Sequence, residues 1–301
     1  MMAVKKYEFT GKTRVFNKHI VREIRAVNDF YAGETFIEKG TVGGYIESEK
    51  NLPNKLESAF GVYHGSWVSG LAVVMDNAKV LDDAYVYEAA VVKDNAIVNG
   101  NALVRGVATV GGHALVGYDP RYEDDYAASQ STPLVFDRAS IMDHAIVMGD
   151  YPSVAGKAII RGHAVVNGDS SYIGGNTELT GNVYVQNRCS MFDGKYTKGE
   201  YNGSFEQPLV LFSNKEDGFD KLADAQKQLV QTIMVWAGST NSDIAFDYKK
   251  EDSQKEFVSF CKKAYKQGYR LPSWFYNHSK ELKVSLKPKE VVKGKVNENE
   301  L

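Results

Sequence analysis

Between residues 62 and 116 of this 301-residue chain, a valine recurs at every sixth position. Four places after each valine the residue is small, first Ser66 and then an alanine at every step from Ala72 to Ala114. This period matches neither an α-helix, at about 3.6 residues per turn, nor the simple alternation of a strand, so it indicates a structural repeat. The valines are Val62, Val68, Val74, Val80, Val86, Val92, Val98, Val104, Val110 and Val116.

The repeat predicts an all-β fold, a parallel β-helix. Each hexad forms one short strand and a corner, and three hexads form one triangular coil. The valine packs inside on a flat face, and the alanine packs inside near a corner where a larger side chain would clash. Coils stack through backbone hydrogen bonds about 4.8 Å apart, and a single coil cannot bury its apolar face alone. We therefore expect Val98 and Val104 to be buried, and Ala96 and Ala102 to have no room for more atoms.

The Val-x-x-x-Ala-x pattern resembles the hexapeptide repeat of left-handed β-helix proteins, many of which are trimeric acyltransferases. The N-terminal segment, with Tyr7-Glu8-Phe9-Thr10-Gly11 and Gly43-Gly44-Tyr45-Ile46-Glu47, is similar to that of the YdcK-type proteins of bacteria and phages, whose acyltransferase label rests largely on their repeat. The resemblance covers roughly residues 5–200. It implies a left-handed helix and a homotrimer. Periodicity alone gives no hand, and crossovers between parallel strands are usually right-handed.

The sequence divides into four parts. Residues 1–61 are expected to form a β-rich cap, because the open end of the repeat would otherwise leave strand edges unpaired. The β-helix is predicted over 62–208, with an inserted loop at 117–134. Residues 209–282 favour a helical module, since apolar residues recur there at helical spacing. Residues 283–301 are rich in lysine, glutamate and asparagine and are predicted to be a mobile tail.

Composition narrows the choice of partners and compartment. The net charge of −2 gives no electrostatic argument for nucleic acid or an anionic membrane. The N-terminus lacks the apolar run of a signal peptide, and no stretch is long and apolar enough to span a bilayer. Two cysteines, Cys189 and Cys261, are too few for a disulfide framework. We expect a cytoplasmic protein that binds neither nucleic acid nor membrane.

A column of histidines follows from the register. If the loop is an insertion within one hexad, equivalent corner positions recur every third hexad, and His113, His144 and His163 stack on consecutive coils. They could form a site for a metal, an anion or proton transfer. Alternatively, this corner takes asparagine or histidine because both tolerate turns and hydrogen-bond the next coil. The whole column reads Asn77, Asn95, His113, His144, His163 and Asn182. No metal is assigned.

The inserted loop is a candidate surface for a partner or ligand. In the family it resembles, such a loop commonly carries or frames a catalytic histidine, which deprotonates the acceptor. This loop contains no histidine, and His113, just before it, is the only substitute. The loop could instead bind a basic partner surface, pack between subunits or be solvated. Its candidate residues are Tyr118, Asp119, Arg121, Tyr122, Glu123, Asp124, Asp125 and Tyr126.

One face of the predicted β-helix is aromatic. Side chains beside its inward positions should point outward, and an exposed apolar area of that size generally marks a covered surface. Subunit packing, docking of the helical module or stacking of a ligand would each cover it. The residues are Trp67, Tyr85, Tyr87, Leu103, Leu134, Phe136 and Tyr172. Elsewhere, His19 lies among basic residues, a setting typical of solvated surface, with a site as the other interpretation.

Two functions follow. The first is a non-catalytic homotrimeric binding protein, phage- or prophage-encoded, that acts on a protein partner or sequesters a small ligand without a cofactor, for example as an inhibitor of a host system. It would use the 117–134 loop or the helical module. The second is a coenzyme A-dependent acyltransferase with its site between subunits, which would use acetyl-CoA and His113. Walker, nucleophile-elbow, Cys-x-x-Cys and His-Glu-x-x-His motifs are absent.

Overall fold

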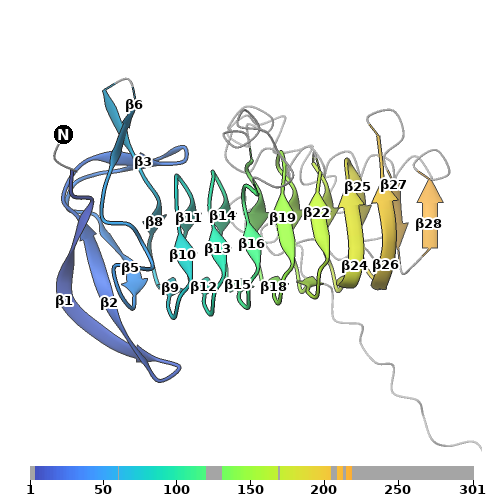
Figure 1. Cartoon of the computed structure of the whole chain (residues 1–301), viewed down its shortest axis with the longest axis horizontal. Helices are drawn as coiled ribbons and strands as arrows, with labels where there is room; N and C mark the ends of the chain where they lie inside the picture. The colour runs from blue at the N-terminus through green and yellow to red at the C-terminus, as the bar shows by residue number, and fades with distance from the viewer. Residues whose placement is uncertain are drawn as a thin grey trace, which may run out of the picture. The chain divides into compact units, whose positions relative to one another are not determined.

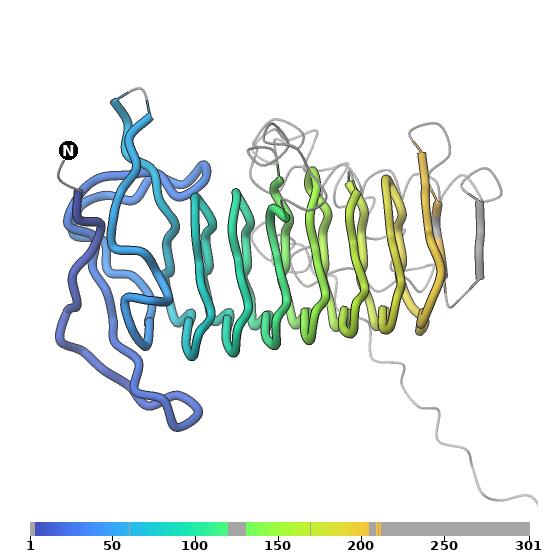
Figure 2. The backbone as a smooth tube through the Cα atoms, viewed as in Figure 1, coloured from blue at the N-terminus to red at the C-terminus, as the bar shows by residue number. Residues whose placement is uncertain are grey.

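The computed structural model describes residues 4–59, 61–119, 131–168, 170–204, 209–212 and 215–218, all within one compact unit, Met1–Asp247. These residues are all-β and form a parallel β-solenoid of about seven turns behind an N-terminal cap. Figures 1 and 2 show the coils following one another from the cap onward. The described residues include no helix, and so none that could cross a membrane.

Each coil contributes one short strand to each of three faces. The first face stacks β9 (Val73–Val74), β12 (Val91–Val92), β15 (Thr109–Val110), β18 (Ser140–Ile141) and β21 (Ile159–Ile160). The second stacks β10 (Lys79–Val80), β13 (Ile97–Val98), β16 (Leu115–Val116), β19 (Ile146–Met148) and β22 (Val165–Asn167). The third stacks β8 (Trp67–Val68), β11 (Tyr85–Val86), β14 (Leu103–Val104), β17 (Leu134–Val135), β20 (Ser153–Val154) and β23 (Tyr172–Ile173). All neighbours within these faces pair in parallel, so the expected repeat is confirmed.

The valines and alanines of the repeat fill the inside of the solenoid. Val98, Val104, Ala96 and Ala102 have no exposed surface, as predicted. Register explains the continuity of the core, because each inward valine pairs with an inward residue of the next coil, as Val86 does with Val104. Burying one such side chain is worth about 1.5–3 kcal/mol relative to exposing it. The stack of coils therefore supplies the stability that a single coil lacks.

The first valine of the series is an exception. Val62 is 40% exposed and belongs to β7 (Val62–His64), a strand of the cap. β7 pairs with β6 (Glu57–Ala59) and β3 (Phe30–Ala32), and not with a coil, so its side chain has no solenoid interior to enter. The inward series starts at Val68, and the cap extends past the predicted boundary at residue 61.

The cap continues the first face of the solenoid. β1 (Tyr7–Phe16), β2 (His19–Ala26) and β5 (Val42–Ile46) form an antiparallel sheet, and β5 then pairs in parallel with β9. A second sheet has the order β4-β3-β7-β6, with β4 at Thr35–Ile37. Pairing with β5 removes the open edge of β9, which is the expected role of a cap.

The far end of the stack is longer than expected. β24 (Glu178–Gln186) bends across one corner, β26 (Lys195–Asn202) pairs with it in parallel, and β25 (Cys189–Met191) extends the third face. β27 (Leu209–Phe212) pairs with β25, and β28 (Lys215–Gly218) turns back antiparallel. Residues 209–212 and 215–218 are thus strands, in the stretch where the sequence predicts the start of the helical module. The rest of that module and the 283–301 tail lie outside the described residues.

Candidate functional site

The corners between the first and second faces position the candidate site. Four residues separate the paired strands, and the second of them has a positive φ in every coil from β9 to β24. Aspartate and glycine tolerate this left-handed conformation better than most residues, which explains their use here. The residues are Asp76, Asp94, Gly112, Asp143, Gly162 and Gly181.

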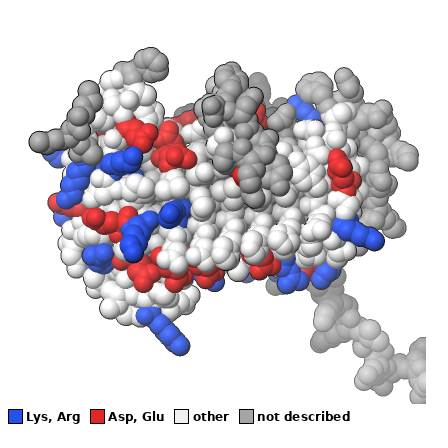
Figure 3. Space-filling model, viewed as in Figure 1, with Lys and Arg blue, Asp and Glu red and all other residues white. Residues whose placement is uncertain are grey.

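Acidic corner residues also connect one coil to the next. The Gly112 N–H donates to the Asp94 carboxylate at 2.9 Å, and the Gly162 N–H donates to that of Asp143 at 3.1 Å. The first of these hydrogen bonds is the main cause of the lowered pKa of Asp94. The other corners repeat the arrangement at Asp82, Glu88 and Asp137. Figure 3 shows acidic side chains gathered along the lower edge of the stack.

The third corner residue carries the histidine column, and the predicted register is confirmed. The ring centroids of His113 and His144 are 5.0 Å apart with nearly parallel planes, and those of His144 and His163 are also 5.0 Å apart. All three side chains are exposed. Toward the cap the column continues as asparagines, where the Asn77 side chain donates to Asn95 at 3.2 Å. We call the corner column of Asn77, Asn95, His113, His144, His163 and Asn182 the histidine edge.

The geometry limits what the histidine edge can do. His113 and His163 are separated by twice the stacking distance, so one ion with bonds of about 2 Å cannot reach all three rings. Within the described parts of the chain, none of the three imidazoles has a hydrogen bond to a carboxylate that would fix its tautomer. The edge is therefore a regular row of exposed imidazoles on a rigid support.

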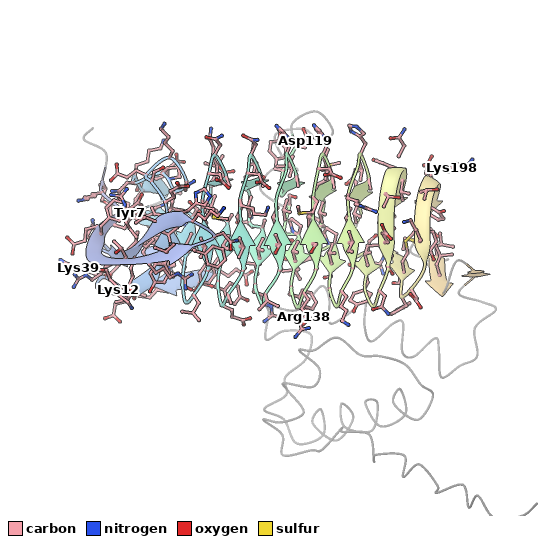
Figure 4. All side chains as sticks on the ribbon, turned by 90° about the horizontal axis from the view of Figure 1, so that it is seen from below. Tyr7, Lys12, Lys39, Asp119, Arg138 and Lys198 are labelled. Carbon is pink, nitrogen blue, oxygen red and sulfur yellow. The ribbon has the colours of Figure 1, made fainter. Side chains whose placement is uncertain are left out.

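Only residues 117–119 and 131–134 of the inserted loop are described. The Tyr118 N–H donates to the Asn99 side chain at 2.8 Å, and that side chain donates back to the Tyr118 carbonyl at 3.1 Å. Asp119 is only 2% exposed. Figure 4 places Asp119 and Arg138 on opposite edges of the stack. The remaining candidates lie outside the described residues: Arg121, Tyr122, Glu123, Asp124, Asp125 and Tyr126.

The aromatic face is mostly covered within the chain. Trp67 is fully buried under the cap, where its ring meets that of Phe30 edge-on at 5.4 Å. Tyr85 and Tyr87 are partly exposed and stack at 4.6 Å. Each of the others is next in sequence to an inward-pointing residue, so it points outward. These outward side chains are nevertheless only 2–5% exposed: Leu103, Leu134, Phe136 and Tyr172. Of the residues proposed for a subunit face, only the Tyr85–Tyr87 pair offers open surface.

A cavity lies at the junction of cap and solenoid, where the sequence pattern predicts none. It measures about 490 Å³, and its lining includes Lys6, His64, Ser66 and Asp83. Lys6 is 1% exposed, and its Nζ donates to Ser66 Oγ at 3.2 Å. Burial lowers the pKa of Lys6 to about 7 and raises that of Asp83. The one hint in the sequence was Ser66, a hydroxyl where the later hexads have alanine.

The sequence matches no protein-family model and no curated protein.

Proposed function

We propose that this chain is a non-catalytic binding protein of the hexapeptide-repeat, left-handed type, related to the YdcK-type proteins, and that it works as a cytoplasmic homotrimer which presents the histidine edge to a protein partner. The observation that carries the proposal is the stack of three exposed imidazoles on consecutive coils. Solenoids use regular, extended surfaces of this kind for binding. A phage-borne inhibitor of a host system is the role this design suits best.

The same observation argues against the acyltransferase alternative. A histidine base normally needs a partner that holds it in one tautomer and orientation, within hydrogen-bond reach of the acceptor. His113 stacks on the parallel ring of His144 instead, and among the described residues the nearby Asp94 carboxylate interacts with it electrostatically without a hydrogen bond that would hold its tautomer. An imidazole held in this way is suited to contact a surface rather than to deprotonate one positioned hydroxyl or amine.

Light scattering and calorimetry on the full chain test the proposal. We expect a trimer and no heat of binding with acetyl-CoA. Micromolar binding of acetyl-CoA, abolished together with acyl transfer by His113→Ala, would put the enzyme first. A variant with His113, His144 and His163 all changed to alanine should remain a trimer. It should no longer bind the partner protein that the native chain binds. If it keeps that partner, the binding surface lies elsewhere.

A further inference from the structure

Three metal-ligating side chains meet where the cap joins the first coil. His19 begins β2, Glu47 directly follows β5, and Asp76 occupies the first corner after β9. One ligand atom from each lies within 4.8 Å of the other two. All three side chains are about a third exposed, so an ion could enter from solvent. Their spacing of 28 residues or more along the sequence hides this cluster from motif analysis.

The two carboxylates approach different nitrogens of the His19 ring. Glu47 Oε1 lies 3.2 Å from His19 Nδ1, and Asp76 Oδ1 lies 3.4 Å from His19 Nε2. For metal–ligand bonds of about 2 Å, the edge of a tetrahedron is about 3.3 Å. Either ring nitrogen can therefore share an ion with the carboxylate beside it, and the other carboxylate would have to turn toward that nitrogen to complete the site.

Each carboxylate is already oriented through its second oxygen. Glu47 Oε2 accepts the Asp76 N–H at 2.6 Å, and Asp76 Oδ2 accepts the Asp94 N–H at 3.0 Å. These backbone donors belong to the solenoid corners and leave Oε1 and Oδ1 facing the imidazole, each at its own ring nitrogen. Supporting hydrogen bonds of this kind are what orient the ligands in protein metal sites.

Nearby arginines do not occupy the ligand oxygens. The Arg22 guanidinium lies over the Phe9 ring at 3.9 Å and donates to the backbone carbonyl of Glu47 at 3.2 Å. The Arg14 guanidinium lies over the Tyr45 ring at 4.0 Å and donates to the Leu71 carbonyl at 2.7 Å. Among the described residues, Glu47 Oε1 and Asp76 Oδ1 therefore contact His19 and neither arginine.

We propose that His19, Glu47 and Asp76 form a binding site for one divalent transition-metal ion, such as Zn²⁺, whose fourth position is open to water. One imidazole and two carboxylates favour such an ion over Ca²⁺ or Mg²⁺, which prefer a shell made of oxygens. The ion would connect β2, the end of β5 and the first corner, and so fasten the cap to the solenoid. The three histidines of the histidine edge take no part in this site.

Zinc titration of the metal-stripped full chain at about pH 7.5 tests the site. Calorimetry should show one Zn²⁺ per chain, and thermal unfolding should move to higher temperature with the ion. His19→Ala and Glu47→Gln should each weaken binding by more than about tenfold, the loss that even an outer partner of a metal site produces. Glu47→Gln retains an acceptor for the Asp76 N–H, so it tests the ligand with little effect on the corner.

The matched control changes the other exposed imidazoles. The triple variant His113→Ala, His144→Ala and His163→Ala should bind Zn²⁺ as the native chain does. X-ray absorption of the zinc-loaded chain should show a single imidazole among its ligands. The proposal fails if the chain binds no Zn²⁺, if His19→Ala binds it unchanged, or if binding disappears in the triple variant.

Discussion

Lys6 is a buried lysine whose charged form the fold disfavours. Its side chain enters the cap end of the β-helix core, where Nζ meets only the hydroxyl of Ser66 among the described residues. That hydroxyl in turn donates to the Val80 carbonyl at 3.0 Å. Burial without a carboxylate partner disfavours the ammonium form, which is why the pKa falls to about 7 even though Asp83 opposes the shift.

The consequence is a stability that rises with pH. Unfolded Lys6 titrates near the ordinary lysine pKa of 10.5, so between the two pKa values the unfolded chain binds a proton that the folded chain does not. Urea unfolding should give a free energy about 1–2.5 kcal/mol larger at about pH 9 than at about pH 7. Lys6→Met, which removes the titrating group, should reduce this difference. If the two proteins show the same pH dependence, the ammonium is solvated in the folded state.

At the residue scale, the sequence predicts the positions of residues that belong to the repeat. It does not predict contacts between residues that lie far apart in the sequence and outside the repeat. The histidine column followed from counting hexads, because position along the repeat determines position in a coil. Lys6 and Ser66 are 60 residues apart, and Lys6 belongs to no repeat. His19 was classed as solvated surface because its charged neighbours in sequence are basic, whereas its neighbours in space are acidic.

Neighbouring coils approach each other most closely at the glycine corners. A Cβ added to Gly112 would lie 2.6 Å from the Asp143 nitrogen, and one added to Gly106 would lie 2.7 Å from the Asp137 carbonyl oxygen. Both glycines also have positive φ. These positions therefore combine a conformational requirement with a steric one.

Comparing two glycines separates these requirements. Gly40 has a φ of +93° and no atom within 4 Å of an added Cβ, so Gly40→Ala should cost about 1–2 kcal/mol for backbone strain. Gly112→Ala adds a clash with the next coil and should cost about 1–3 kcal/mol more. Thermal unfolding followed by circular dichroism measures both variants. Equal losses would mean that the stack relaxes around the new methyl group.

The repeat predicted its elements well wherever valine and alanine occupy the hexad, and it failed where other residues take their place. In the last turns the inward positions are filled by larger side chains, including Tyr196 and Leu211, which are 5% and 2% exposed. Parallel pairing of β26 and β27 with the preceding turn keeps these strands in the stack. Backbone pairing therefore extends the solenoid beyond the end of its sequence signature.

At the scale of the whole described unit, β5 is the cap strand that pairs with a strand of the solenoid. β5 pairs with β9 through hydrogen bonds from the Tyr45 N–H to the Ala72 carbonyl and from the Glu47 N–H to the Val74 carbonyl, both 3.0 Å. β5 covers the edge of β9 in the first coil. Without it that edge would be unpaired, and unpaired strand edges recruit other chains. Gly43 and Gly44 allow the close approach, since neither has room for a Cβ.

Gly44→Val should therefore turn a capped molecule into a self-associating one. A Cβ at this position would lie 2.8 Å from Val68 Cγ1 and 2.9 Å from the Ala72 carbonyl oxygen, and the branched side chain would push β5 away from β9. Sedimentation velocity should then show species larger than the native assembly that grow with concentration. Gly40→Ala is the control, because it strains the same cap without touching the junction, and it should sediment as the native chain does. A Gly44→Val chain that unfolds at lower temperature but sediments as the native chain would show that the cap does not protect the edge of the first coil.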